Sequence, residues 1–373
     1  MIRPTLARVD LKALTSNYAA IVDHLKAEQP EHTPGVIAVV KANAYGHGAV
    51  QVAKALERAG ADLLACADIE EGAALRAAGV ECEILVFGAL SVSDLDGLFD
   101  CRLTPTISTP GAAIAVQAAA ARYKQRVRYH LKIDTGMNRL GFRSDNVRRS
   151  LPALFHSPNL ELDAIYTHFA TADDPESPHF AQQRTRFEQA LRDVEALGGK
   201  PRYRHASNSA AFLRDSRVWY DRVRPGLLLY GIVPPPLAST LPLSPVMTLH
   251  SKVVAVKGMR PGEISGYGGR FLADDPVTIA IIPAGYADGL DLRLAGRGAV
   301  LIRGRRVPVI GSVCMDMLTV DVTGLEVFPG DDAVILGEQG HDRIDAREMA
   351  STIGTIPWEI VCRVGSRIER VYE

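Results

Sequence analysis

The first two-thirds of the chain alternates apolar, strand-like runs with helix-like segments. The run at residues 36–40 is continuously apolar and β-branched, as expected for a parallel strand that is buried on both faces. Seven more candidate strands follow it, at residues 62–67, 84–88, 103–107, 127–134, 160–169, 202–206 and 223–230. Eight repeated strand–helix units predict a closed (β/α)8 barrel of the TIM type.

Amphipathic or alanine-rich helical patterns lie between these strands, most clearly at residues 50–59, 70–78, 111–122 and 180–197, and another at 15–26 precedes the first strand. The pattern changes after Pro234-Pro235-Pro236, a stiff segment without backbone donors. Beyond it lie β-rich runs at 247–256, 277–282, 299–302, 307–310, 318–322 and 332–336, and one helical pattern at 345–352. The sequence therefore predicts an α/β barrel domain at 1–240 and a mostly-β domain at 241–373, to which a short strand from the first residues can add.

Composition excludes several classes of function. The 42 lysines and arginines nearly balance the 43 aspartates and glutamates, so no basic field for nucleic acid is expected. No stretch is apolar enough to span a bilayer, and the N-terminus lacks a secretory signal core. The five cysteines are scattered and form no CxxC pair, which predicts reduced thiols in a cytoplasm and no metal site; they are Cys66, Cys82, Cys101, Cys314 and Cys362.

Lys41 stands where the first strand ends and a glycine-containing loop begins. Barrel enzymes react at the carboxyl ends of their strands, and a desolvated lysine there loses pKa and becomes available for Schiff-base chemistry. A solvated lysine at a strand end is the alternative.

The string around Lys41, VVKANAYGHG, resembles the lysine motif of PLP-dependent alanine racemases. Further segments are similar to that family's signatures and occur in the family's order: RPTLARVDLKALTSNY, HLKIDTGMNRLGF, THFATAD, HASNSAAF, RVRPGLLLYG, ISGYGGRF, GYADG, GSVCMDM and CRVGSRIERVY. The resemblance covers nearly the whole chain. It implies that Lys41 holds pyridoxal 5′-phosphate covalently.

The resemblance also implies a phosphate site made by Tyr45, Ser209, the backbones of Gly226 and Leu227, and residue 358. Barrels often bind phosphate after strands seven and eight, and Ser209 precedes a short helical pattern whose N-terminus favours an anion. An ordinary helix N-cap is the alternative for Ser209. Trp358 departs from the family, which usually has tyrosine there, and an indole N–H differs in reach from a phenol.

Arg224, near the end of the eighth strand, matches the residue that faces the pyridine nitrogen of PLP. An arginine does not give up a proton readily, so the ring nitrogen stays unprotonated and side reactions such as transamination are limited. Fold-related decarboxylases place a glutamate there. A phosphate-binding or surface arginine is the alternative role.

Racemisation requires a base on each face of the substrate. By resemblance Lys41 serves one face and Tyr267 the other, with His168 bonded to the tyrosine. A free phenol has a pKa of about 10, so the tyrosine must be tuned to work near neutral pH. A lone histidine that ends a strand is more often structural.

Arg139 matches the residue that bonds the PLP phenolic oxygen and helps to hold the substrate carboxylate. Lys132 lies nearby, and two buried cations without an anion would be costly. The family's solution is a carbamate on this lysine; the alternative is a lysine paired with an acid. Met315 and Asp316 match residues near the substrate carboxylate, although a core methionine and a turn aspartate would look the same.

The resemblance implies an alanine racemase that supplies D-alanine for peptidoglycan and works as a homodimer whose active site is shared across the interface. A racemase of another small amino acid is one alternative, since a methylene is worth only about 1–3 kcal/mol of discrimination. Arg224 and Tyr267 argue against a fold-related decarboxylase. The β domain and the second base argue against a non-catalytic PLP carrier. The sequence does not separate a biosynthetic from a catabolic role.

Overall fold

The structure, a computed structural model, describes residues 4–90 and 94–373. The chain divides into two compact units. The barrel unit comprises Thr15–Ala44 and Ala49–Leu243, and the β unit comprises the chain up to Leu14, Tyr45–Gly48 and Ser244–Glu373.

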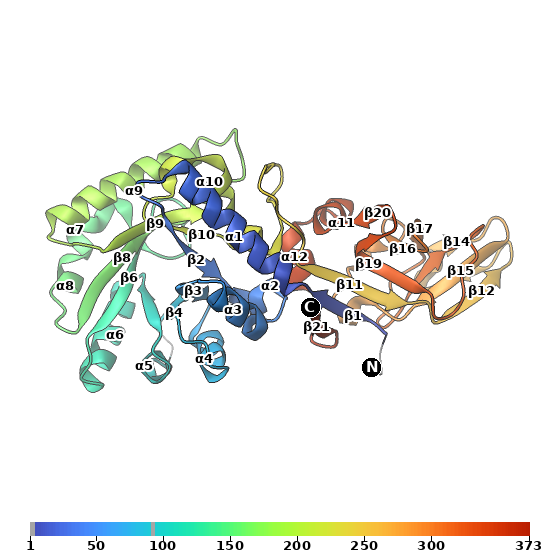
Figure 1. Cartoon of the computed structure of the whole chain (residues 1–373), viewed down its shortest axis with the longest axis horizontal. Helices are drawn as coiled ribbons and strands as arrows, with labels where there is room; N and C mark the ends of the chain where they lie inside the picture. Colours follow the sequence, from blue (N-terminus) through green and yellow to red (C-terminus); the bar gives the residue numbers. More distant parts are fainter. Residues whose placement is uncertain (1–3, 91–93) are drawn as a thin grey trace. The chain divides into compact units, whose positions relative to one another are not determined.

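The barrel unit contains a closed ring of eight parallel strands with helices outside it (Figure 1). Each strand pairs with its neighbours in the order β2-β3-β4-β5-β6-β8-β9-β10, and β10 pairs with β2 to close the ring. The predicted barrel is confirmed. Its strands are β2 (Gly35–Val39), β3 (Leu63–Cys66), β4 (Glu83–Val86), β5 (Thr104–Ile107), β6 (Val127–Asp134), β8 (Leu160–Tyr166), β9 (Tyr203–Asn208) and β10 (Arg222–Arg224), with the short β7 (Phe142–Arg143) beside β6.

Local signals set the outer helices. Asp68 and Thr109 accept hydrogen bonds from backbone N–H groups in the first turns of α4 and α6, and Pro110 occupies a first-turn position that needs no donor. The helices are α1 (Leu11–Glu28), α3 (Ala49–Arg58), α4 (Ile69–Ala77), α5 (Asp96–Asp100), α6 (Pro110–Arg122), α7 (Val147–Ser150), α8 (Pro152–Phe155), α9 (His179–Ala196) and α10 (Ser209–Arg214).

The prediction of one strand over 223–230 is wrong in its second half. Strand β10 ends at Arg224, and Leu227–Tyr230 form a 3-10 helix instead. Pro225 has no N–H to continue the sheet, and an apolar run alone does not distinguish a buried strand from a buried helical turn. The break places Gly226 and Leu227 at the carboxyl end of the eighth barrel strand.

The β unit is built on one long mixed sheet in the order β12-β15-β18-β17-β16-β19-β11-β1-β21. The first strand of the chain, β1 (Leu6–Val9), pairs antiparallel with β11 (Met247–Lys252) and parallel with β21 (Glu369–Tyr372), so residues near the N-terminus belong to this unit. The other strands are β12 (Ala255–Met259), β13 (Ile264–Ser265), β14 (Phe271–Leu272), β15 (Val277–Ile282), β16 (Ala299–Ile302), β17 (Arg305–Ile310), β18 (Leu318–Asp321), β19 (Asp332–Gln339) and β20 (Asp342–Ile344), with helices α11 (Ala346–Ile353) and α12 (Pro357–Cys362).

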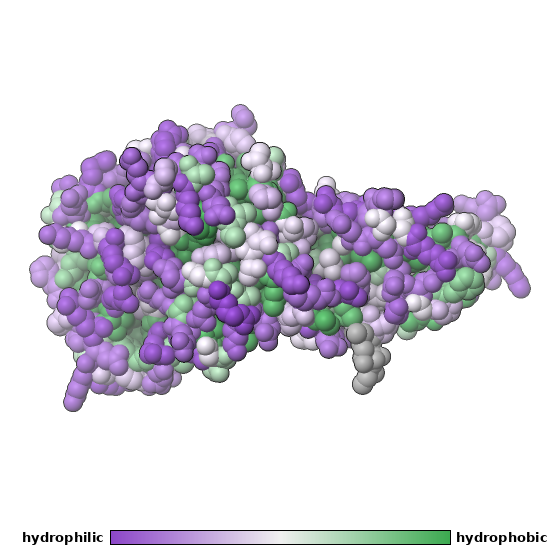
Figure 2. All heavy atoms as spheres, in the orientation of Figure 1, coloured by the Kyte–Doolittle hydropathy of each residue, from purple (hydrophilic) through white to green (hydrophobic). Residues whose placement is uncertain are grey.

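Hydrophilic residues cover most of the face drawn in Figure 2, and hydrophobic residues show between them in separate areas. Within residues 4–90 and 94–373, no helix combines the length and apolarity needed to cross a bilayer. None of the five cysteines forms a disulfide within the described residues.

Candidate active site

The carboxyl ends of the barrel strands bring together most of the predicted site residues. Lys41 follows β2, Lys132 lies near the end of β6, His168 follows β8, and Arg224 ends β10. The charges of the two lysines and of the arginine each lower the pKa of His168, so the four side chains share one electrostatic environment. This end of a barrel is where enzymes of this fold carry out their chemistry.

Lys41 opens a left-handed turn. Ala42, Asn43 and Ala44 all have φ near +54°, and Tyr45 continues the turn at φ +51°. Such a conformation costs about 1–2 kcal/mol for each residue that is not glycine, so the surrounding structure must impose it. The backbone that carries Lys41 is therefore held under strain, as is common at functional sites.

Two side chains hold this turn, and neither of them was predicted from the sequence. The Glu71 carboxylate accepts hydrogen bonds from the backbone N–H groups of Asn43 (3.3 Å) and Ala67 (2.8 Å). The Asn43 side chain in turn accepts from the first N–H of α3, that of Ala49 (2.8 Å). Glu71 is the third residue after an aspartate N-cap, a position from which it would usually bond back to its own helix.

Ser209 is buried at the start of α10, directly after β9. Its hydroxyl oxygen accepts hydrogen bonds from the N–H groups of Gly226 (3.0 Å) and Leu228 (3.4 Å), which follow β10. The carboxyl ends of the seventh and eighth strands thus gather one hydroxyl and several backbone donors in one place. Such groups suit a phosphate because they supply N–H and O–H donors without bulk.

Arg224 is 4% exposed, and in the described part of the chain no carboxylate pairs with it. Its Nη2 donates to the carbonyls of Thr167 (2.8 Å) and Ala206 (2.9 Å) and approaches His168 Nδ1 at 3.3 Å. Burial lowers the pKa of Arg224 to about 10, which leaves it charged at neutral pH. The barrel mouth therefore contains a buried guanidinium whose charge no acid neutralises.

His168 faces Arg224 with its Nδ1. A guanidinium only donates, so Nδ1 accepts and the single ring proton of the neutral histidine sits on Nε2. Burial, followed by the charge of Arg224, holds the pKa of His168 well below its usual value. The ring is therefore neutral, and Nε2–H is its donor.

Lys132 is 7% exposed, and among the described residues no acid lies within ion-pair distance of its amine. The amine lies 5.5 Å from the centre of the Tyr166 ring. Burial, together with the charges of Arg139 and Arg224, lowers the pKa of Lys132 to about 8. Arg139 is exposed and lies on the loop after β6. The Asp134 carboxylate stabilises this loop because it accepts hydrogen bonds from the N–H groups of Gly136 and Asn138.

A buried glutamine on α9, which the sequence analysis missed, ties two of the catalytic-face loops together. Gln183 donates to the carbonyl of His168 (3.0 Å) and to Thr135 Oγ1 (3.1 Å), and it accepts from the N–H of Ala170 (2.8 Å). Thr135 also bonds Thr167 (2.7 Å). A single polar residue in a helical pattern gives no sequence signal for this role, because its partners lie in loops that follow two barrel strands.

The β unit presents its predicted residues on loops. Tyr267 is 79% exposed, in the turn between β13 and β14, and its carbonyl accepts a hydrogen bond from Ser312 (2.6 Å). Gly266 packs so closely on the Ser312 backbone that a Cβ there would lie 2.9 Å from its nitrogen. The backbone of Tyr267 is therefore fixed while its phenol is free to meet another surface.

Met315 and Asp316 lie on the loop that begins near Ser312 and are both exposed. The carbonyls of Cys314 and Met315 accept from the N–H groups of Tyr286 (3.0 Å) and Ala287 (3.1 Å). Asp316 is paired with Arg367 (2.6 Å). The β unit thus gathers Tyr267, Met315 and Asp316 at neighbouring loops.

Two residues predicted at the phosphate also belong to the β unit. Tyr45 is half-buried, and burial raises its pKa, as does the nearby Cys362. Trp358 lies half-buried on α12. Their place at the phosphate stays a prediction.

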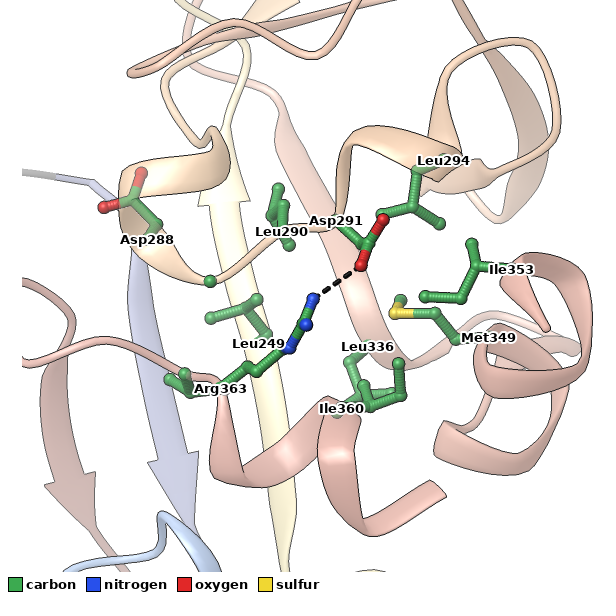
Figure 3. A pocket seen from close by; sticks show the side chains of 12 residues that line it. Leu249, Asp288, Leu290, Asp291, Leu294, Leu336, Met349, Ile353, Ile360 and Arg363 are labelled. Atoms are coloured by element: carbon green, nitrogen blue, oxygen red, sulfur yellow. Dashed lines mark hydrogen bonds and ion pairs between the residues drawn. The ribbon is translucent and has the colours of Figure 1, made fainter. Parts of the chain in front are cut away.

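A separate apolar pocket in the β unit contains none of the predicted residues (Figure 3). An ion pair between Arg363 and Asp291 crosses it. Its apolar walls come from Leu249, Leu290, Leu294, Leu336, Met349, Ile353, Ile360 and Val364. With about 20 Å³ of space for a water-sized group, it is too small for an amino acid.

Comparison with known families accounts for nearly the whole chain. Residues 9–234 match the family described as "Alanine racemase, N-terminal domain", and residues 246–372 match "Alanine racemase, C-terminal domain". The chain belongs to the alanine racemase family. It is therefore a racemase, an enzyme of the isomerase class, and this family generally depends on PLP.

Individual alanine racemases are similar over their full length. One from Carboxydothermus hydrogenoformans is 42% identical over 99% of this chain and all of that protein, and one from Symbiobacterium thermophilum is 40% identical over 99% and 97%. The crystal structure of an alanine racemase from Streptomyces lavendulae covers the whole chain and 98% of its own, at 34% identity and a TM-score of 0.94. One from Bacillus anthracis with bound L-Ala-P has a TM-score of 0.88, also at 34% identity, covering 100% and 96%.

Proposed function

We propose that the chain interconverts L- and D-alanine with PLP bound at the carboxyl end of the barrel, and that Lys41 and Tyr267 are its two bases. The observation that carries the proposal is the cluster of cations at this end of the barrel, with a neutral histidine among them. Such a cluster suits a substrate carboxylate and an anionic cofactor, which supply the missing negative charge.

The residues present fit PLP. The Ser209 hydroxyl oxygen accepts from the N–H groups of Gly226 and Leu228, and its own O–H can donate to a phosphate. We assign Ser209, Gly226 and Leu227 to the phosphate together with Tyr45 and Trp358. Arg224 has five N–H groups, of which only part is used by described acceptors, so one is available to face the pyridine nitrogen. When bound, PLP delocalises the electrons left by removal of the substrate α-proton.

Lys41, once released from its covalent link to the cofactor, holds or returns the α-proton on one face of the substrate through Nζ. Tyr267 Oη does the same on the opposite face. His168 supports the tyrosine, since its Nε2–H can donate to the phenolic oxygen and stabilise it when it has lost its proton. Arg139, Met315 and Asp316 hold the substrate carboxylate and its surroundings.

Lys132 is proposed to carry a carbamate. Its lowered pKa increases the fraction of uncharged amine, which is the form that attacks CO2. The nitrogen forms a bond to the CO2 carbon and loses one proton, which leaves a carboxylate anion. That anion would neutralise the cluster and orient Arg139.

The racemase is proposed to be a homodimer in which Tyr267, Met315 and Asp316 of one chain reach the barrel of the other. Support comes from the exposure of Tyr267, because a general base must be shielded from bulk water during reaction. The free thiols fit a reducing cytoplasm, where the enzyme would supply D-alanine for peptidoglycan.

The test is to purify the protein and quantify its bound PLP. The loss of optical activity is then followed for each member of a panel of amino acids, and the same reactions are analysed for decarboxylation products. Racemisation of alanine in preference to serine and larger substrates is expected. Racemisation that favours another amino acid would replace the substrate, and release of CO2 from the substrate would identify a decarboxylase.

A further inference from the structure

A line of hydrogen-bonded polar side chains runs through the barrel interior from Arg224 to Tyr203. Arg224 Nη1 lies 2.8 Å from His205 Nδ1, and His205 Nε2 lies 3.1 Å from His130 Nδ1. His130 Nε2 lies 2.9 Å from the hydroxyl of Tyr203. Both histidines are completely buried, on β9 and β6. His205, His130 and Tyr203 have no part in the proposed racemisation.

The chemistry of Arg224 fixes the direction of every bond in this line. A guanidinium only donates, so His205 Nδ1 accepts. Burial and the surrounding arginines hold the pKa of both histidines far below neutrality, to about 3 for His130, so each ring carries one proton. The proton of His205 must then sit on Nε2 and be donated to His130 Nδ1, and His130 must donate its Nε2–H to Tyr203.

The same tautomers exclude a metal site at His130. Glu83, His130 and Asp163 offer atoms within 4.8 Å of one another, as metal ligands would. However, neither nitrogen of His130 keeps a free lone pair, since one accepts and the other is protonated. Asp163 is already paired with Arg202 at 3.2 Å. The group is therefore the end of the hydrogen-bonded line.

Packing prevents the first ring from turning. Tyr166 stacks on His205 with ring centres 4.6 Å apart and planes 11° apart, and the Tyr166 hydroxyl is bonded to Thr106 at 3.1 Å. Arg224 lies 5.3 Å from the centre of the same tyrosine ring. His205 therefore presents its acceptor to Arg224 in one orientation.

We propose that His205 and His130 are positioning residues that hold Arg224 as a cation without a neutralising acid and aim its remaining N–H groups at the ring nitrogen of the cofactor. This inference rests on the proposed role of Arg224 toward PLP. A carboxylate in place of His205 would also satisfy Arg224, but it would cancel the charge that keeps the ring nitrogen unprotonated. A neutral acceptor backed by a second neutral ring orients the guanidinium and leaves its charge intact.

The first test uses the wild-type holoenzyme with ¹⁵N-labelled histidine rings. Between pH 6 and pH 8, NMR should show His205 and His130 each protonated only at Nε2. A proton on Nδ1 of either ring, or a doubly protonated ring, would overturn the proposal, because the line would then run in another direction or carry charge.

The second test compares His205→Leu, which removes the acceptor, with His205→Asn, whose amide oxygen can replace it. The half-buried His24, which packs on Phe212 and Trp219, provides the control His24→Leu. The measurement is the ratio of transamination to racemisation. In transamination the amino group passes from alanine to PLP, leaving pyruvate and the pyridoxamine form.

We expect this ratio to rise about tenfold in His205→Leu. We expect a smaller rise in His205→Asn and none in His24→Leu. An unchanged ratio in folded His205→Leu would refute the positioning role while the wild type still racemises alanine. A wild type that binds no PLP or does not racemise alanine would instead refute the proposed function. If His205→Leu does not fold, His205→Asn and the NMR measurement decide.

Discussion

The two units present their candidate residues in opposite ways. In the barrel unit, Lys132 and Arg224 are 7% and 4% exposed, and Arg224 has several fixed partners. In the β unit, Tyr267 and Met315 are 79% and 52% exposed, and only the backbones that carry them are fixed. The barrel site is therefore organised within one unit, whereas the β-unit residues need another surface to act on. The loss of a barrel residue and the loss of a β-unit residue should therefore have different consequences.

Lys41→Ala should have the largest effect. With no amine at the end of β2, racemisation should fall by more than about 10³-fold because both the covalent link and one base are lost. Borohydride reduction and peptide mapping of the wild type should place the cofactor on Lys41. Lys26→Ala, on the exposed surface of α1, is the control. A label on another lysine would contradict the assignment.

Tyr267→Phe should nearly abolish racemisation, yet proton exchange on one face of the substrate should continue. The barrel base Lys41 is untouched, so solvent deuterium should still exchange into one enantiomer, expected to be D-alanine. Mass spectrometry of both enantiomers in D₂O measures this asymmetry. Equal residual exchange from L- and D-alanine would show that the two residues do not serve opposite faces.

Lys132→Ala should reduce activity by about tenfold or more, which corresponds to at least about 1.4 kcal/mol in the barrier. Acetate should restore part of the activity by replacing the lost carboxylate, and removal of CO2 should weaken the wild type. The exposed Lys200→Ala should do neither. Native mass spectrometry should find a chain that is about 44 Da heavier than the unmodified chain, which is the mass of the CO2 added in one carbamate. A bare amine paired with an acid would be the contrary result.

Mixed dimers test whether the exposed β-unit residues serve the other chain. Lys41→Ala and Tyr267→Ala, refolded together with PLP, should form mixed dimers in half of the cases, each with one intact site. About a quarter of wild-type activity should return, while each variant refolded alone stays inactive. No gain despite demonstrated mixed dimers would place both bases in one chain.

Glu71→Gln should have the smallest effect. The amide loses one of the two oxygens that accept from Asn43 and Ala67, at a cost of about 1 kcal/mol in the stability of the strained turn. Amide hydrogen exchange at Asn43 should quicken several-fold, and PLP should dissociate faster. The neighbouring exposed Glu70→Gln provides a matched control. Unchanged exchange at Asn43 would show that the turn is held by other contacts.

The sequence was sufficient to predict the barrel, because buried parallel strands read as apolar, β-branched runs with short helices between them. The prediction is wrong at 223–230, where an apolar run that resembles the other strands is a strand followed by a 3-10 helix. The family's motifs pointed to the site residues, and the structure brings those of the barrel together. Tyr45 and Trp358 belong to the β unit, and their place at the phosphate stays a prediction.

Local periodicity and motifs of adjacent residues are enough to predict which residues stand at the strand ends. The partners that hold these residues in place follow only from the folded chain. Glu71 bonds Asn43 across 28 positions, and His205 meets His130 across 75. Hydrogen bonds between segments far apart in the chain leave no local pattern, because their geometry exists only after the barrel closes. The proton positions along the line from Arg224 to Tyr203 depend on those closed distances and on burial, neither of which a sequence contains.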